Sequence, residues 1–343
     1  MSGPVSFAVA TPARNGLPDV LDAVESALGQ TLPPAEVVVV DDGSTDGTGD
    51  AVRGRFGSRV RVVAGRFGGA AAARNAAWRA STAPWVAFLD ADDLWSPVKL
   101  ETAAECLARR PEAAWFFSDG AFRSIDGEWH DSWLALYADL PEPYVGQPVA
   151  ELIEVNFILT SSVVVRREAL ESTGGFDESM SHAEDLDLWI RLARGWPAAA
   201  SRRALVRYQH RAGGLTRQIE ARLLGDVSLV HRLAADRSLP PRLRSRARAR
   251  EALARYKLAY AALREGRTGD ARVHLAGAWV FPDRAWAVAA TWLASLLPPA
   301  WLARLRRDEW TKRRLVAPTM RTRRVSLISG ERLDAGCPPG AAR

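Results

Sequence analysis

The chain has 343 residues, 48% of them hydrophobic and 25% charged, which excludes a disordered chain and suits one large core or two domains. Its two cysteines, Cys106 and Cys337, form no Cys-x-x-Cys pair, which excludes a zinc framework and favours reduced thiols in the cytoplasm. The net charge of +6 comes from residues 311–343, which hold eight basic and two acidic residues.

Residues 5–10 are a short apolar run that ends at Thr11, which predicts a buried parallel strand. Residues 17–28 carry apolar side chains at helical spacing until Gly29. Further strands are predicted at residues 36–40, 59–63 and 85–89, with helices at about 45–56 and 70–80 between them. This alternation predicts an α/β domain with a twisted, mostly parallel sheet. Ligands bind at the carboxyl ends of such strands, so Thr11, Asp41–Asp42 and the acids at 90–93 should share one crevice.

From about residue 215 the sequence changes to Arg, Ala and Leu at helical spacing. We therefore predict a first domain at 1–215, a C-terminal helical extension at 216–310, and a basic, flexible tail at 311–343. Such a tail is usually solvated, and the alternative is contact with anionic lipid or a phosphorylated acceptor.

The N-terminus has no signal-peptide pattern, and no apolar run reaches the roughly 18 to 20 residues that span a bilayer. We expect a cytoplasmic protein with no nucleic-acid partner. Peripheral contact with the inner face of the plasma membrane, through the tryptophan-rich stretch at 286–301 and the basic tail, is a further expectation.

The acids Asp90, Asp92 and Asp93 follow directly on the apolar run at 85–89. Carboxylates this close repel one another unless a cation neutralises them, and their hard oxygens suit Mg²⁺ or Mn²⁺. A solvated acidic turn is the alternative. Asp42 follows another predicted strand and could accept hydrogen bonds from a nucleobase or ribose, or cap a helix. Arg74 follows a small-residue segment and could face an anion, although a packed alanine helix explains that segment equally well.

Short motifs in a fixed order resemble glycosyltransferase family 2 over about residues 5–217. They are Thr-Pro-Ala-Arg-Asn at 11–15, Val-Val-Asp-Asp-Gly-Ser-Thr-Asp at 39–46, Ala-Arg-Asn at 73–75, Phe-Leu-Asp-Ala-Asp-Asp at 88–93, Gly-Gly-Phe-Asp-Glu at 174–178 before Glu184–Asp185, and Tyr208-Gln209-His210 with Thr216. The tyrosine that the family usually carries in the first motif is absent. The resemblance implies a single Rossmann-like nucleotide-diphospho-sugar transferase domain, the GT-A fold. About residues 1–120 would form its nucleotide-binding half and about residues 121–215 its acceptor-side half.

The resemblance also implies an inverting, metal-dependent transfer from a UDP-, GDP- or dTDP-sugar to an acceptor hydroxyl, in cell-envelope polysaccharide, glycolipid or other glycoconjugate synthesis. Asp185 would be the catalytic base. Asp42 would contact the nucleobase, and Thr11, Arg14, Arg74 and Asp90 would contact the rest of the donor nucleotide. Mn²⁺ or Mg²⁺ would be held by Asp92, with help from Asp90 and His210, although a lone histidine is equally often structural.

The acceptor side is the least constrained part of the site. We expect Glu184, Trp129 and Trp133 there, although core packing explains most of the thirteen tryptophans. Two other functions remain open. A nucleotidyltransferase acting on sugar phosphates would need a basic glycine-rich loop near the N-terminus, where residues 11–16 offer only Arg14. A catalytically silent carbohydrate- or membrane-binding module would not need the acids at 90, 92 and 185.

Overall fold

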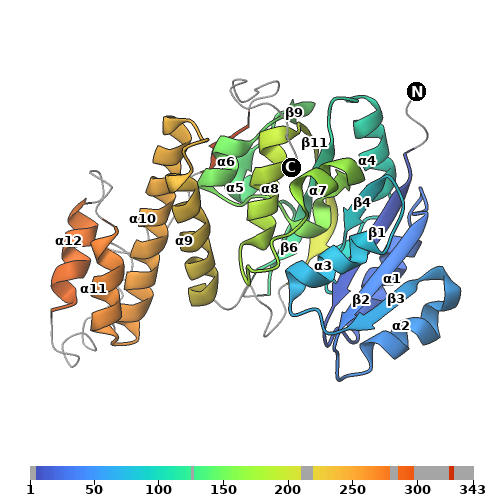
Figure 1. Ribbon diagram of the computed structural model, residues 1–343, viewed down its shortest axis with the longest axis horizontal. Coiled ribbons are helices and arrows are strands. Elements are labelled where there is room, and N and C mark those ends of the chain that lie inside the picture. The colour runs from blue at the N-terminus through green and yellow to red at the C-terminus, as the bar shows by residue number, and fades with distance from the viewer. Residues whose placement is uncertain (1–4, 125–126, 210–218, 279–284, 297–323, 328–343) are drawn as a thin grey trace. The chain divides into compact units, whose positions relative to one another are not determined.

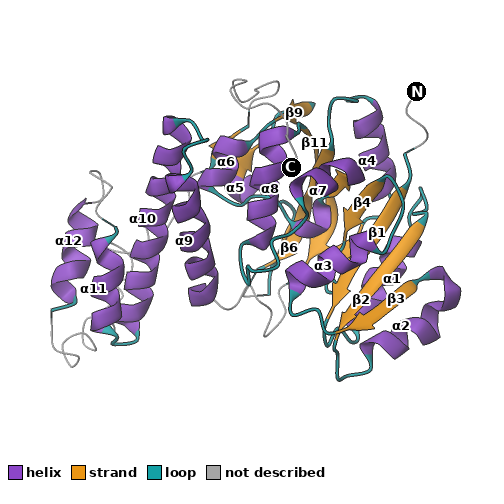
Figure 2. Cartoon of the chain, in the orientation of Figure 1, coloured by secondary structure: helices purple, strands orange, loops and turns teal. Residues whose placement is uncertain are grey.

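The computed structural model describes residues 5–124, 127–209, 219–278, 285–296 and 324–327. The chain divides into two compact units. The first, here called the sheet unit, comprises residues 1–152, 156–212 and 324–343, and the second, the helical unit, comprises residues 153–155 and 213–323. Figures 1 and 2 show strands and helices in the former and helices in the latter. Among the described residues, no helix combines the length and apolar character that crossing a bilayer requires.

The sheet unit is built on a ten-stranded sheet whose main path runs β3-β2-β1-β4-β10-β6-β11-β5. These strands are β1 (Phe7–Ala13), β2 (Glu36–Asp42), β3 (Arg61–Gly65), β4 (Trp85–Phe88), β5 (Leu94–Trp95), β6 (Trp115–Arg123), β10 (Val164–Arg166) and β11 (Ala198–Tyr208), with β7 (Trp129–His130) beside β6 and β9 (Tyr144–Gly146) beside β11. The predicted α/β fold with C-terminal helices is confirmed. The N-terminal strands β3, β2, β1 and β4 are all parallel, as predicted.

The second half of the sheet is more mixed than the sequence indicated. β10 runs antiparallel to both β4 and β6, and β11 pairs antiparallel with β5 and β9. Because β10 is reversed, the residues just before it lie at the same edge as the residues just after β4. One hydrogen bond of this edge joins the Phe88 amide to the Val163 carbonyl oxygen at 3.1 Å. The segment that leads into β10 therefore becomes part of the site.

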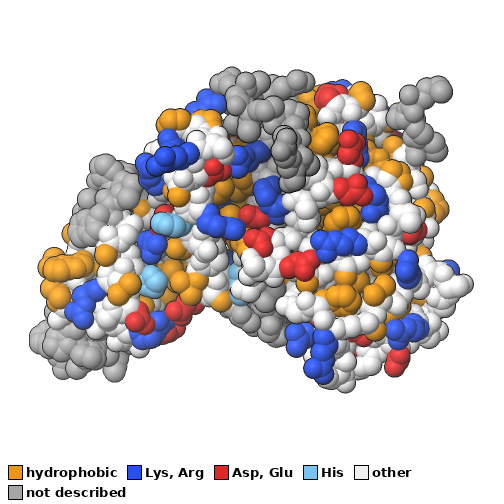
Figure 3. Space-filling model, in the orientation of Figure 1, with side chains coloured by type: hydrophobic (Ala, Val, Ile, Leu, Met, Phe, Trp, Pro, Cys, Tyr) orange, Lys and Arg blue, Asp and Glu red, His pale blue; other side chains and the backbone are white. Residues whose placement is uncertain are grey.

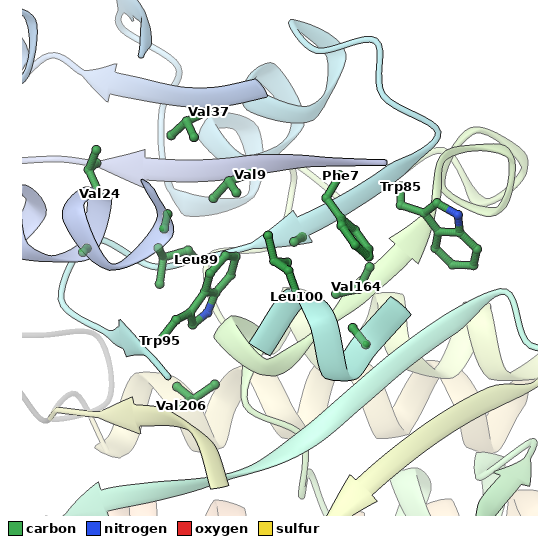
Figure 4. Packing of buried hydrophobic residues seen from close by; sticks show 14 of the residues in the cluster. Phe7, Val9, Val24, Val37, Trp85, Leu89, Trp95, Leu100, Val164 and Val206 are labelled. Atoms are coloured by element: carbon green, nitrogen blue, oxygen red, sulfur yellow. The ribbon is translucent and has the colours of Figure 1, made fainter. Parts of the chain in front are cut away.

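Helices cover both faces of the sheet. On one face, α1 (Asp19–Leu28), α2 (Thr48–Phe56) and α4 (Lys99–Ala108) pack against alternate residues of the strands. Figure 4 shows Val9, Val24, Leu89 and Leu100 among the side chains of this core. The other face carries α3 (Ala70–Arg79), α7 (Arg167–Thr173) and α8 (Glu184–Gly195), which Figure 1 shows in front of the strands. The small side chains of α3 allow it to pack closely on β1 and β2.

Aromatic rings fix α8 to that second face. Trp189 of α8 stacks on Trp115 of β6 with ring centroids 6.2 Å apart, and it also contacts Phe88 and Phe176. Buried aromatic pairs of this kind contribute about 0.5–1.5 kcal/mol each beyond their buried area. The first turn of α8, which carries Glu184 and Asp185, is therefore held firmly relative to the end of β4.

The helical unit consists of helical hairpins. Its described helices are α9 (Ile219–Ala235), α10 (Pro241–Arg264), α11 (Thr268–Ala276) and α12 (Ala285–Ala294). Leu223 and Val227 of α9 pack against Ala254 and Leu258 of α10. A second apolar cluster joins the end of α10 to α11 and α12 through Tyr256, Ala259, Leu263, Ala271, Leu275 and Val288.

Part of the predicted flexible tail is ordered. Within residues 311–343 the structure describes Arg324–Leu327, where β12 (Val325–Ser326) pairs in parallel with β8 (Ala138–Asp139) of the sheet unit. Arg324 forms an ion pair with Asp139, while Val325 and Leu327 are buried. The alternating pattern of these residues is typical of an edge strand. Sequence analysis missed this strand because the segment is basic overall, and two apolar side chains at strand spacing barely change its average hydropathy.

A fully buried lysine lies under the segment before β10. Lys99 is 0% exposed, with Nζ 3.3 Å from the Ser162 carbonyl oxygen and 4.6 Å from the centre of the Trp95 ring. Burial lowers the pKa of Lys99 from 10.5 to about 7. Between these two values the unfolded chain binds more protons than the native protein, so native stability rises with pH across that interval.

We expect Lys99→Met to stabilise the fold by a few kcal/mol at pH 7, because a similar volume is kept and a buried charge is removed. The advantage should shrink as the pH rises toward 10. Urea denaturation of both proteins from pH 6.5 to 9.5 measures this difference. If the stability of Lys99→Met depends on pH in the same way as that of the wild type, the lowered pKa of Lys99 is not the cause of that dependence.

Candidate active site

The carboxyl ends of β2, β1 and β4 meet at one edge of the sheet, because these strands are parallel neighbours. Asp42 ends β2, Ala13 ends β1, and the acidic loop at 90–93 follows β4. These segments therefore lie at the same edge of the sheet, and the predicted crevice between them stays a prediction. The loop after β1 is also tied to the loop after β2: Asn15 N–H donates to Ser44 Oγ at 2.9 Å, and Gly16 N–H donates to Thr48 Oγ1 at 2.8 Å.

The two acids at the end of β2 have different backbone partners. Asp41 accepts hydrogen bonds from Ser44 N–H at 3.0 Å and from Gly49 N–H, in the first turn of α2, at 3.1 Å. Asp42 accepts from Gly68 N–H at 3.1 Å and Gly69 N–H at 2.9 Å, and also from Phe67 N–H. Asp42 thus fixes the glycine loop that leads into α3. Its predicted contact with a nucleobase would add to this role and stays a prediction.

Thr11 lies within β1 and Arg14 directly follows that strand, and the two residues differ in exposure. Thr11 is 0% exposed, and its Oγ1 has no hydrogen-bond partner among the described residues. A buried hydroxyl without a hydrogen-bond partner is unfavourable. A hydrogen bond between Thr11 Oγ1 and the predicted donor nucleotide would remove this cost. Arg14 is exposed just past the end of β1. Both positions are compatible with the predicted donor contacts, which stay predictions.

Arg74 connects the acidic loop to the start of α8. Its guanidinium donates to Asp90 through Nε at 3.1 Å and through Nη2 at 2.9 and 3.0 Å, and its Nη1 donates to Glu184 at 2.9 Å. Burial alone would lower the pKa of Arg74, but attraction to Asp90 and Glu184 raises it above its usual value. The anions that face Arg74 are therefore protein carboxylates, and its predicted contact with the donor would have to be shared with them.

The other two acids of the loop differ in burial. Asp93 is 1% exposed and accepts hydrogen bonds from Ser161 Oγ and from Gln209 N–H at 3.3 Å. Burial, and then repulsion by Asp92 and Asp90, raises the pKa of Asp93 well above its usual value. Ser161 Oγ also accepts from Asp90 N–H at 3.0 Å. Asp93 is thus a structural acid of the loop, whereas Asp92 is partly exposed.

Asp185 lies in the first turn of α8, beside Glu184. Its Oδ2 accepts from Asn156 Nδ2 at 3.0 Å, and its Oδ1 accepts from Leu186 N–H at 2.7 Å. Burial, followed by the charge of Glu184, raises the pKa of Asp185 to about 6. A carboxylate with this pKa is ionised near neutral pH and can accept a proton. Glu184 is directed at Arg74, so its contacts favour a supporting role over the predicted acceptor-side role.

Three residues of the site were missed by sequence analysis: Asn75, Asn156 and Ser161. Asn75 Nδ2 donates to the Phe176 carbonyl oxygen and to Glu178 Oε1, each at 2.8 Å, which fixes the segment before α8. The motif at 73–75 could have indicated Asn75. Asn156 and Ser161 lie in a stretch without a motif and reach the site only because β10 is antiparallel.

Of the predicted acceptor-side tryptophans, Trp129 lies in β7 and Trp133 in the segment that follows it. Trp133 packs on Phe122, Tyr137 and Tyr208, and its Nε1 donates to the Phe157 carbonyl oxygen at 3.0 Å. This bond ties Trp133 to the residue next to Asn156. Trp129 is 41% exposed, and the Arg207 guanidinium lies 4.4 Å from the centre of its ring. His210, predicted as a metal ligand, lies outside the described residues.

The residues present fit a divalent cation that is only partly bound by protein. The described residues contain no group of three or more His, Cys, Asp or Glu side chains arranged to hold a metal ion. Mg²⁺ and similar ions commonly use one or two carboxylates and take their remaining ligands from water and substrate phosphates. Asp92 and Asp90, in a loop with three carboxylates, would provide this kind of donor set.

The sequence of this chain is similar to a known protein family and to several named proteins. The family model described as "Glycosyl transferase family 2" matches residues 8–174. TuaG of Bacillus subtilis, named for a glycosyltransferase role in teichuronic acid biosynthesis, is 31% identical over 206 residues, covering 59% of this chain and 77% of TuaG. The succinoglycan biosynthesis protein ExoO of Rhizobium meliloti is 32% identical over 244 residues, covering 68% of this chain and 69% of ExoO.

Solved structures share the fold. S. aureus TarS 1–349 in complex with UDP-GlcNAc has a TM-score of 0.62 at 16% identity, covering 88% of this chain and 91% of that chain. The mannosyltransferase PcManGT from Pyrobaculum calidifontis, in complex with GDP-Man and Mn²⁺, has a TM-score of 0.56 at 23% identity, covering 86% of this chain and 87% of that chain. At these identities the likeness concerns the fold.

Proposed function

This chain belongs to glycosyltransferase family 2, and we propose that it is a metal-dependent, inverting enzyme that moves a sugar from a nucleoside-diphosphate sugar to an acceptor hydroxyl. One observation carries the proposal. Arg74 bridges Asp90, in the acidic loop, and Glu184, the neighbour of Asp185. This bridge joins the loop at 90–93 to the start of α8, which supports a site with a leaving-group end at the loop and a proton-accepting end at Asp185.

In the proposed reaction, Asp185 takes the proton from the acceptor hydroxyl as that oxygen forms its bond to the anomeric carbon. The bond from this carbon to the diphosphate oxygen breaks on the opposite face, and the diphosphate leaves with the electron pair. A bound Mn²⁺ or Mg²⁺ held by Asp92 and Asp90 would supply stabilisation of the negative charge on that leaving group. Arg74 holds Asp90 in place, and Asn75 fixes the segment that leads into α8.

The names of relatives support a role in cell-envelope polysaccharide synthesis, since TuaG and ExoO carry names from teichuronic acid and succinoglycan biosynthesis. The two solved structures hold UDP-GlcNAc and GDP-Man, which supports a nucleotide-sugar donor. The test is a panel of UDP-, GDP- and dTDP-sugars incubated with the protein. Release of nucleoside diphosphate supports the proposal, whereas release of pyrophosphate from a nucleoside triphosphate and sugar phosphate would indicate a nucleotidyltransferase.

We expect Asp92→Ala to weaken binding of the donor nucleotide by at least about tenfold in the presence of Mn²⁺, because the metal loses its protein ligand. Chelator should weaken binding to the wild-type protein by a similar factor and leave Asp92→Ala nearly unchanged. Titration calorimetry with UDP, GDP and dTDP measures this. If chelator does not change the affinity of the wild-type protein for the donor nucleotide, the metal has no part in the mechanism.

We also propose that the helical unit brings the enzyme to an anionic membrane, where lipid-linked acceptors lie. Figure 3 shows hydrophobic side chains gathered over α12, where Trp292 and Leu293 are 40% and 60% exposed. The sequence that follows α12 is rich in Lys and Arg, which favour anionic lipid. Flotation with phosphatidylglycerol-containing liposomes should recover the full chain but less of a truncation at residue 310. Equal flotation of the two proteins would show that the tail does not contribute to membrane binding.

A further inference from the structure

We infer that Asn156 is the positioning residue for the proton-accepting carboxylate: its side-chain amide holds Oδ2 of Asp185 and thereby fixes how this carboxylate faces the acceptor. The inference rests on the proposed function and adds to it a residue outside every motif of the family resemblance. Asn156 belongs to the segment before β10, which the antiparallel direction of that strand brings to the site edge.

The orientation of the Asn156 amide is fixed by two hydrogen bonds. Its Oδ1 accepts from the backbone N–H of Ile158 at 3.3 Å, and its Nδ2 donates to Asp185 Oδ2 at 3.0 Å. A flipped amide would lose the first bond and would set an oxygen against a carboxylate. Asn156 therefore presents a donor to Asp185, and a donor favours the ionised form that accepts a proton.

The charges around Asp185 make this donor important. Glu184, the preceding residue of α8, repels a negative charge on Asp185, whereas Arg74 of α3 attracts it. Arg74 is already paired with Asp90 and Glu184. Another titratable side chain near Asp185 in the sequence is His182, three residues before it. Among the residues that the structure describes, Asn156 and the Leu186 N–H donate hydrogen bonds to Asp185. Each Asp185 oxygen accepts one of these bonds and keeps a further lone pair for the acceptor proton.

The substitution Asn156→Asp tests this role, because it replaces a donor with a carboxylate of nearly the same shape. The pKa of Asp185, already raised to about 6 by burial and by Glu184, would rise further beside a second negative charge. The base must be ionised to work, so the wild-type kcat/KM should fall as the pH drops through about 6. In Asn156→Asp we expect this acid limb to move up by at least about one pH unit, with the rate recovering toward pH 9.

The assay measures nucleoside diphosphate released from whichever UDP-, GDP- or dTDP-sugar the wild-type protein uses fastest, from pH 5 to 9. Asn156→Ala removes the donor without adding charge, so its acid limb should move up by less and its kcat should fall with KM for the donor unchanged. Gln147→Glu is the matched control, because it adds a carboxylate at another partly buried amide of the sheet unit. Its acid limb should coincide with that of the wild type.

A purely structural role for Asn156 predicts a different result, namely rates lowered equally at every pH with lowered thermal midpoints. That result, in either Asn156 variant, would overturn the inference, and so would an unmoved limb in a folded Asn156→Asp protein. If Asn156→Asp does not fold, the limb of Asn156→Ala decides in the same way. Turnover retained in Asp185→Asn would instead refute the assignment of the base, so the two failures are distinguishable.

Discussion

Asp185→Asn should lower the rate of sugar transfer by about 10²–10⁴-fold, the usual contribution of a general base, while donor binding changes little. The amide cannot take a proton from the acceptor, but it keeps the shape of the carboxylate. Its carbonyl oxygen can still accept the hydrogen bond that Asn156 donates to Asp185, so the start of α8 should stay in place. Steady-state rates and donor titrations on the same protein measure the two effects separately.

Asp187→Asn is the matched control for that experiment. Asp187 lies one half-turn further along α8 and pairs with Arg191 rather than with the site. The same chemical change there should leave the transfer rate within about twofold, because Asp187 has no part in the proposed proton transfer and its carboxylate pairs with Arg191. Near-normal turnover in Asp185→Asn, or equal losses in the two variants, would contradict the role of Asp185.

Arg74→Met should lower the stability of the fold by about 3–5 kcal/mol, the usual cost of removing one partner of a buried ion pair. The Arg74 side chain is 8% exposed, and its loss leaves Asp90 and Glu184 facing each other without a cation. Arg74→Lys keeps the charge but cannot form the forked contact to Asp90, so we expect an intermediate loss. Urea denaturation, followed by a signal from the sheet unit such as its buried tryptophans, measures the change.

Arg79 offers a control on the same helix. Its ion pair with Glu178 joins side chains that are 52% and 47% exposed, so Arg79→Met should cost at most about 1 kcal/mol. Adding Asp90→Asn and Glu184→Gln to Arg74→Met should restore part of the lost stability, because the unpaired charges are removed. A loss in Arg74→Met no greater than that in Arg79→Met would show that the bridge is not a stabilising element.

The N-terminal half of the sheet could be predicted because each of its strands is a short apolar run between turn residues. Some helices and strands begin at other residues than predicted, because the loops before them have a hydrogen-bonded structure of their own. α2 begins at Thr48 rather than near residue 45, because Asp46 accepts from the Thr48 amide and hydroxyl and so belongs to the preceding turn. β3 begins at Arg61 because Gly57–Arg59 forms a 3₁₀ turn. β2 continues through Asp42, so both acids lie within the strand.

The antiparallel strand β10 could not be predicted in the same way. Val164–Arg166 is only three residues long, and nothing local tells a strand of that length which neighbour it pairs with. Its direction is set by packing between β4 and β6, which are far from it in the sequence. Missing this strand meant missing Asn156 and Ser161, since both reach the site through it.

The acids of the site could be identified from sequence, but not their partners. Asp90 and Asp185 stand in recognisable motifs, whereas the Arg74–Glu184 pair joins residues 110 positions apart. Sequence analysis gave Arg74 an anion as its partner and placed Glu184 on the acceptor side of the site. Only the packing of α3 and α8 on the same face of the sheet assigns these two residues to each other.

The most direct test of the proposed mechanism follows donor binding and nucleoside diphosphate release together in wild type, Asp92→Ala and Asp185→Asn, with Mn²⁺ and with chelator. In that mechanism the loop at 90–93 acts on the leaving group and Asp185 takes the acceptor proton. Asp185→Asn should therefore bind donor in a chelator-sensitive way without turning it over, and Asp92→Ala should lose the chelator-sensitive binding itself. Loss of the same property in both variants would contradict the division of work between the two acidic sites.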